Sequence, residues 1–279
     1  MMRTALRGTT AGVLGAFLFL VAGPLDTKTP IGHPLVGVAQ ANAWTDDWVV
    51  VGETFAWNGT LRPGSKLVIE TINGSIRAET GTGTSASVEG TRFARRGKDA
   101  WEDARIEVDQ EDDLVRIRVR FDKNREKRDD DNWVRVDFVV VVPPGVTFAP
   151  STVNGSIRAE NMGGPVTAHS VNGPIRVGGD GRISASAVNG DIRASVVGRS
   201  DDAPVELDTV NGTIDLYLPE NANADLSASA VNGDISSDVP LVVQGKFGSK
   251  RVYGKLGKGG PKYELSTVNG HIRLRTPDA

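Results

Sequence analysis

The chain has 279 residues, of which 24% are charged and 6% are aromatic, and it contains no Cys. The absence of Cys excludes a disulfide framework and a lipid anchor on a leader cysteine. The formal net charge of −3 argues against a general nucleic-acid-binding protein, because such proteins usually carry a basic excess.

Residues 1–43 are predicted to be an export leader. Arg3 and Arg7 precede an apolar run at residues 11–23, which suits a signal-peptide core and is shorter than the ~20 residues of a membrane span. We expect cleavage after Ala43, with cleavage after Ala41 or Gly23, or retention as an uncleaved anchor, as the alternatives.

No stretch after the leader is apolar over the length of a transmembrane span. We therefore expect an exported protein that is periplasmic, exposed on the cell surface or secreted. Cleavage would remove three of the 32 basic and one of the 35 acidic residues, which leaves a net charge of −5.

Residues 44–145 are predicted to form an N-terminal β segment. Strand-like alternation runs through residues 101–121 and resumes at residues 133–142, before Pro143, Pro144 and Gly145 end it. The charge run at residues 122–132 between these strands is expected to be an exposed hairpin tip or loop, that is, a charged hairpin insertion.

Residues 146–279 are predicted to be a β-repeat domain. Between residues 152 and 273 the motif [Thr/Ser/Ala]-Val-Asn-Gly-x-Ile occurs six times, and related copies lie upstream. Asn tolerates a positive φ and Gly takes one freely, so each Asn-Gly pair is predicted to be a structural turn. These turns are Asn58-Gly59, Asn73-Gly74, Asn154-Gly155, Asn172-Gly173, Asn189-Gly190, Asn211-Gly212, Asn232-Gly233 and Asn269-Gly270.

The residues around each Asn alternate with period two. Relative to the Asn, apolar or small residues recur at positions −6, −4, −2, +3 and +5, which predicts strand–turn–strand units with one buried face. The fold class is therefore all-β, and no long amphipathic helix is expected.

Two architectures fit this pattern. In a single-stranded β-solenoid, or β-helix-like array, each Asn-Gly is a corner, and stacked corners form an Asn hydrogen-bond ladder. In an antiparallel hairpin meander or sandwich, each Asn-Gly is a type I′ turn. Spacings of 17–22 residues and small inward side chains favour the solenoid. The 37 residues from Asn232 to Asn269 match two coils with one degenerate corner.

Candidate chemistry is sparse. His169 and His271 are expected to be surface residues without a companion motif. Asp129, Asp130 and Asp131 do not have the spacing of a calcium loop, and neighbouring bases neutralise them. We expect no catalytic, metal-binding or cofactor-binding residues and no cofactor.

Arginines recur at position +4 of the repeats, at Arg77, Arg158, Arg176, Arg193 and Arg273. If the corners stack, Arg158, Arg176 and Arg193 align as an exposed basic stripe. Such a stripe is a possible binding surface for acidic glycans or lipid headgroups, with an ordinary solvated face as the alternative.

Four segments carry a family resemblance: Leu61–Ala78, Val140–Ala159, Leu216–Ile235 and Gly257–Leu274. Together they resemble a bacterial β-strand-repeat family of unknown function that is labelled putative adhesin. The resemblance covers roughly residues 50–275. It implies an exported or envelope-associated β-repeat protein and supplies no catalytic residues.

These observations predict an exported, non-enzymatic β-repeat protein that acts in adhesin-like surface binding or as an envelope scaffold. Its expected partner is an envelope protein or a glycan, and not a nucleic acid. The alternatives are an envelope-stress or signalling accessory that binds a membrane partner, and a polysaccharide-acting β-helix enzyme.

Overall fold

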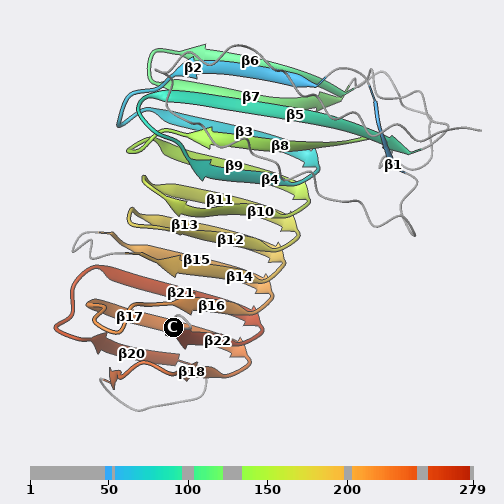
Figure 1. Ribbon diagram of the computed structural model, residues 1–279. Coiled ribbons are helices and arrows are strands. Elements are labelled where there is room, and N and C mark those ends of the chain that lie inside the picture. The colour runs from blue at the N-terminus through green and yellow to red at the C-terminus, as the bar shows by residue number, and fades with distance from the viewer. Residues whose placement is uncertain are drawn as a thin grey trace, which may run out of the picture. The chain divides into compact units, whose positions relative to one another are not determined.

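A computed structural model describes residues 48–51, 54–95, 104–121, 134–197, 203–243 and 251–276 (Figure 1). All described residues belong to the unit Trp44–Ala279. The predicted leader and its cleavage sites lie outside the described residues, as does the charge run at residues 122–132. Every regular element within the described ranges is a β-strand, which confirms the all-β class.

The strands in the described part of Trp44–Ala279 form two sheets of 11 strands each. Sheet 1 contains β1 (Trp48–Val50), β2 (Phe55–Thr60), β4 (Ile76–Thr80), β5 (Ser85–Arg95), β8 (Val134–Val142), β10 (Ile157–Met162), β12 (Ile175–Gly179), β14 (Ile192–Val196), β16 (Ile214–Tyr217), β18 (Ile235–Ser237) and β22 (Ile272–Arg275). Sheet 2 contains β3 (Lys66–Asn73), β6 (Ala104–Glu111), β7 (Leu114–Phe121), β9 (Thr147–Asn154), β11 (Val166–Asn172), β13 (Ile183–Asn189), β15 (Val205–Asn211), β17 (Ala224–Asn232), β19 (Val242–Val243), β20 (Arg251–Leu256) and β21 (Lys262–Asn269).

Each repeat is one rung, defined as a strand of sheet 2, an Asn-Gly corner and a strand of sheet 1. Equivalent strands of neighbouring rungs pair in parallel and in register, so that Asn172 lies beside Asn189 in sheet 2 and Ile175 lies beside Ile192 in sheet 1. The solenoid prediction is therefore confirmed. The hairpin alternative is wrong, because the two strands that flank a corner belong to different sheets and do not pair with each other.

The core lies between the two sheets and follows the predicted alternation. In the rung of Asn211, the side chains of Val205, Leu207, Thr209, Ile214 and Leu216 are all buried. Each fully buried aliphatic side chain contributes about 1.5–3 kcal/mol relative to exposure. Because the same positions recur in every rung, the core is continuous along the array.

The order of rungs in space departs from the order in the chain at the C-terminal end. After the rung of β17 and β18, the chain forms β19 and β20, and β20 pairs antiparallel with β17. The chain then returns and inserts β21 between β15 and β17, and β22 between β16 and β18. The expectation of two coils with a degenerate corner is therefore wrong: the 37 residues contain an antiparallel strand and a return, not a further coil.

The segment before the repeats continues both sheets. Strand β3 pairs in parallel with β9, and β4 pairs in parallel with β10, so that Asn73 joins the same array of corners. Strands β7 and β8 flank the charge run and lie in different sheets, so they do not pair as a hairpin, and the alternative of an exposed loop between them remains a prediction. A hairpin does occur one step earlier, between β6 and β7. The boundary at residues 145 and 146 remains a prediction.

Candidate functional site

The Asn side chains of seven corners form one hydrogen-bonded ladder. Each Nδ2 donates to the Oδ1 of a neighbouring rung over 2.7–2.9 Å, and at the N-terminal end the Nδ2 of Asn73 donates to the carbonyl oxygen of Val134. In spatial order the ladder is Asn73, Asn154, Asn172, Asn189, Asn211, Asn269 and Asn232. All bonds run in the same direction, so each Asn inside the ladder is both donor and acceptor.

The corner geometry differs from the one expected. None of the ladder Asn residues has a positive φ, so Asn is used for its side-chain amide and not for a left-handed backbone. Gly173 has a φ of 146°, but Gly190 and Gly212 are outside the left-handed region. At Gly190 a Cβ would instead overlap the carbonyl oxygen of Gly173, so close stacking of corners excludes a side chain there.

Position −2 has a role that sequence reasoning missed. The hydroxyl of Thr209 donates to the carbonyl oxygen of Gly190 over 3.0 Å, and Thr152 and Thr267 make the same bond to the neighbouring corner glycine. These side chains are buried, so the bond satisfies a carbonyl that the corner leaves beside the core. The recurrence of Thr and Ser at this position was the available signal.

Asn58 and Gly59 are not a corner, so that assignment is wrong. Both lie inside β2, where Asn58 pairs with Ser87 and Gly59 pairs with Ala86 of the antiparallel strand β5. A Cβ at Gly59 would lie 2.5 Å from the ring of Trp57. Here Gly leaves room for an aromatic ring on the strand surface, which explains the residue without a turn.

The Val at position −1 forms an exposed aliphatic line beside the Asn ladder. Its side chains retain 37–50% of their surface exposed. The line contains Ile72, Val153, Val171, Val188, Val210, Val231 and Val268. β-Branched side chains suit strands and cover one another across paired strands, which accounts for this position by structure alone.

The arginines at position +4 meet on the outward face of sheet 1. Arg158 lies beside Arg176, Arg176 lies beside Arg193, and Arg77 extends the run on the other side of Arg158. We call these four exposed residues the arginine ladder. Arg273 is separated from it, because β16 places Asp215 between Arg193 and Arg273.

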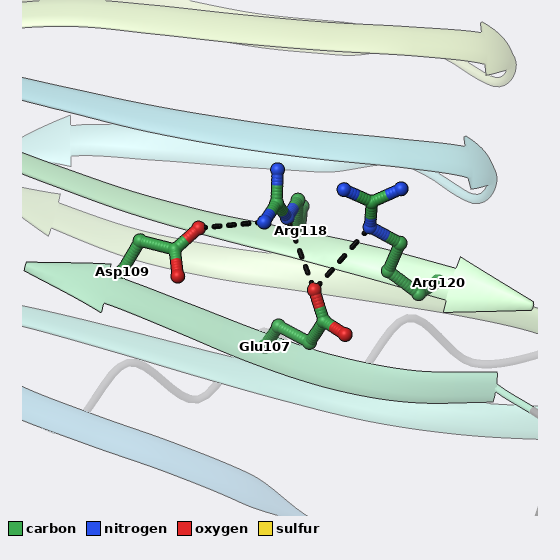
Figure 2. Close-up of polar contacts among 4 residues, drawn as sticks. All are labelled: Glu107, Asp109, Arg118 and Arg120. Atoms are coloured by element: carbon green, nitrogen blue, oxygen red, sulfur yellow. Dashed lines mark hydrogen bonds and ion pairs between the residues drawn. The ribbon is translucent and has the colours of Figure 1, made fainter.

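Several described arginines outside the ladder contact carboxylates. On the β6–β7 hairpin, Arg118 contacts Glu107 at 3.1 Å and Asp109 at 2.8 Å, and Arg120 contacts Glu107 at 3.3 Å (Figure 2). Asp215 likewise faces Arg273 and Arg275 at 3.8 and 3.5 Å. Opposite charges on paired strands stabilise a sheet, so these arginines fit a structural role.

The outward face of sheet 2 carries an acidic group. Glu206 pairs in register with Glu264, and Asp208 lies two residues along the same strand as Glu206. Desolvation, together with Glu206 and Glu264, raises the pKa of Asp208 above its ordinary value. Like charges on neighbouring strands are unfavourable, so this group stores a small destabilising repulsion.

The two described histidines do not have the arrangement of a Ser–His–Asp triad. Nδ1 of His169 lies 2.7 Å from Oγ of Ser186, and Asp208 follows Ser186 in register on the next strand. Ser therefore stands between His and Asp, whereas a triad needs His between the nucleophile and the carboxylate. His271 is exposed on the other side of the corner, 3.9 Å from Asp234. The two histidines are not brought together.

An open hollow of about 510 Å³ lies at the N-terminal end of the Asn ladder, with Trp48, Ser75 and Arg135 among its lining residues. Arg135 stacks on the rings of Trp48 and Phe93, with 5.1 and 4.5 Å from its guanidinium carbon to the ring centroids. Asp137 contacts Arg135 at 3.5 Å and accepts a hydrogen bond from the backbone amide of Ser75. Arg135 is thus held by one carboxylate and two rings, although its buried Nε has no hydrogen-bond partner within the described ranges.

Two further properties concern only the ranges that the structure describes. Within them, no group of three or more His, Asp or Glu side chains has the arrangement of a metal site. Over the same ranges no helix is long and apolar enough to cross a bilayer. Asp129, Asp130 and Asp131 lie outside the described residues.

Comparison with solved structures gives distant similarities. Similar solved structures include a putative cell adhesion protein from Clostridium sporogenes (11% identity, 80% of this chain and 100% of that chain covered, TM-score 0.49) and a putative adhesin from Bacteroides fragilis (15% identity, 80% and 98% covered, TM-score 0.29). A comparison with curated proteins gives no match.

The family profile described as Toastrack DUF4097 matches residues 64–275. This range contains all seven corners of the Asn ladder. The expected assignment to a β-strand-repeat family of unknown function is thereby confirmed. The chain belongs to the Toastrack DUF4097 family.

Proposed function

We propose that this chain is an exported, non-enzymatic β-repeat protein that binds a partner at the cell envelope through the outward faces of its sheets. One observation carries the proposal. The rungs stack in register, so side chains at one position of the repeat form a line across many strands. A regular line of identical groups suits an extended partner better than a single small molecule.

The distribution of reactive groups supports a non-enzymatic role. The His169–Ser186 contact lies on a flat outward face, where the neighbouring strands use their backbone amides for sheet pairing. No amides of that face are left to stabilise an oxyanion beside Ser186. The chemistry available there is hydrogen bonding to a bound partner.

Two measurements on cells that produce the tagged full chain test the proposal. We expect the protein in the exported fractions, and we expect the purified protein to sediment with isolated envelope material without degrading it. Residence in the cytosol, absence of any envelope binding, or turnover of an envelope glycan by the purified protein would each contradict the proposal.

A further inference from the structure

The arginine ladder places four like charges in a straight row across paired strands. Arg77, Arg158, Arg176 and Arg193 occupy the same register position on β4, β10, β12 and β14. With strands ~4.8 Å apart, the row spans ~14 Å. Like charges directly opposite each other on neighbouring strands destabilise a sheet, so this arrangement works against the fold.

The fold does not require arginine at this position. The equivalent residue is Asp215 on β16 and Ser236 on β18, and both strands pair in the same parallel register. The side chain points outward in every rung, away from the core. Arginine in four consecutive rungs is therefore not explained by packing or by strand geometry.

The ladder is incompletely neutralised. Arg158 contacts Glu160 of its own strand, and Arg193 has a long contact of 3.9 Å to Asp215 and lies over the ring of Tyr217. Arg77 and Arg176 have no ion-pair partner among the described residues. This differs from Arg118, whose two carboxylate contacts are shown in Figure 2.

Small residues flank the middle of the ladder. Position +2 carries Ser156 and Pro174 beside Arg158 and Arg176, and position +6 carries Gly178 beside Arg176. Side chains of this size do not cover the guanidinium group of Arg176 from either side, whereas Glu160 at position +6 contacts Arg158. A chain-like ligand can therefore lie along the row, perpendicular to the strands, and meet successive guanidinium groups.

We propose that the arginine ladder binds a linear acidic polysaccharide that carries a carboxylate on its sugar units, such as a polyuronate. This inference rests on the proposed envelope-binding function and names the chemistry of its ligand. The planar guanidinium fork pairs with carboxylate through two parallel hydrogen bonds, and a row of forks matches a row of carboxylates.

The charges around the ladder favour a polymer over a membrane surface. Glu79 and Asp191 are exposed on the same face, and Glu160 lies beside Arg158. A broad anionic surface would meet these carboxylates together with the arginines and would be repelled by them. A narrow polymer that follows the ladder meets mainly the arginines, so the geometry points to a line-shaped anion.

The test uses calorimetric titration of the purified full chain with polygalacturonate, with neutral dextran as the control polymer. The ladder variant combines Arg158→Gln, Arg176→Gln and Arg193→Gln. The matched control combines Lys66→Gln, Lys258→Gln and Lys262→Gln, which removes the same charge from exposed lysines outside the ladder. Thermal unfolding shows that each variant is folded.

We expect wild type to bind polygalacturonate and not dextran, with affinity that falls as salt rises. The ladder variant should lose about tenfold or more in affinity, the sum of three exposed ion pairs, while the control stays within about twofold. A variant with Lys in place of the same three arginines should bind more tightly than the Gln variant and more weakly than wild type. Lysine keeps the positive charge but lacks the two parallel hydrogen bonds that a guanidinium group makes to a carboxylate.

Three outcomes overturn the inference. They are equal binding by wild type and the ladder variant, no binding of polygalacturonate, and ladder-dependent binding to phosphatidylglycerol vesicles without polyuronate binding. If the ladder variant still sediments with envelope material as wild type does, the ligand assignment fails while the proposed function stands. If wild type binds no envelope material, both fail.

Discussion

Replacing Gly190 by Ala places a single methyl group between two stacked corners. The new Cβ would overlap the carbonyl oxygen of Gly173 and lie 2.7 Å from its carbonyl carbon. Both corners are fixed by backbone hydrogen bonds, from the amide of Gly173 to Asn189 and from the amide of Gly190 to Asn211, at 2.9 and 3.0 Å. The overlap can therefore be relieved only by moving rungs apart.

The expected cost follows from these contacts. Separation of the rungs weakens the two backbone bonds and the side-chain bonds that join Asn189 to Asn172 and Asn211. If these four bonds, each worth roughly 1 kcal/mol, are weakened by half, they and the local overpacking give a loss of about 3 kcal/mol in the free energy of unfolding. Urea unfolding followed by far-ultraviolet circular dichroism measures this loss.

Gly83→Ala is the matched control. Gly83 has a φ of 69°, and a Cβ there would meet nothing within 4 Å, so the substitution costs only the left-handed backbone, about 1 kcal/mol. Gly190 is outside the left-handed region, so its cost comes from stacking alone. If Gly190→Ala proves no more destabilising than Gly83→Ala, the stacked-corner explanation is refuted.

Three further predictions concern single residues. Asn189→Ala removes a donor and an acceptor from the Asn ladder and should lower the free energy of unfolding by about 1–2 kcal/mol, as measured by urea unfolding. A loss no larger than that of Asn58→Ala would show that the ladder does not contribute to stability. Asp208→Asn should raise the Tm at pH 7, because burial and neighbouring acids raise the pKa of Asp208 and its ionised form opposes folding. The gain in the free energy of unfolding should be tenths of a kcal/mol and should vanish below the ordinary pKa of 3.8. A gain that persists in acid would contradict the assignment. Asn232 should deamidate faster than the other ladder Asn residues, because the backbone amide of Gly233 lacks a hydrogen-bond partner among the described residues. This amide nitrogen is free to attack the side-chain carbonyl of Asn232 and expel ammonia. Peptide mass spectrometry of aged protein measures deamidation at each Asn, and equal deamidation at all ladder positions would contradict the prediction.

The sequence predicted the core well, because a solenoid repeats the same inward positions. Val205, Leu207 and Ile214 are buried as the period-two alternation requires. The choice between corner and hairpin had to come from spacing and side-chain size, since both architectures place positions −2 and +3 inward. The role of Thr209 could not be derived without a neighbouring corner carbonyl as its acceptor.

Other features depend on which strands become neighbours. The insertion of β21 between β15 and β17 is a long-range pairing that no local pattern encodes. Asn58 has the same Asn-Gly dipeptide as the corners but lies inside β2, because its flanking residues pair with β5. The arginine stripe could be anticipated from position +4 alone. That Arg273 lies directly beside Asp215 required the spatial order of the rungs, because Ser236 stands between them in the order of the chain.

The central claim is that the Asn-Gly corners support the fold while the arginine ladder serves binding. The most direct measurement is the Tm of the variant that combines Arg158→Gln, Arg176→Gln and Arg193→Gln, at low salt. Removing like charges from neighbouring strands should leave the Tm unchanged or raise it. A Tm clearly below that of wild type would show that the arginines support the fold, and would contradict the claim.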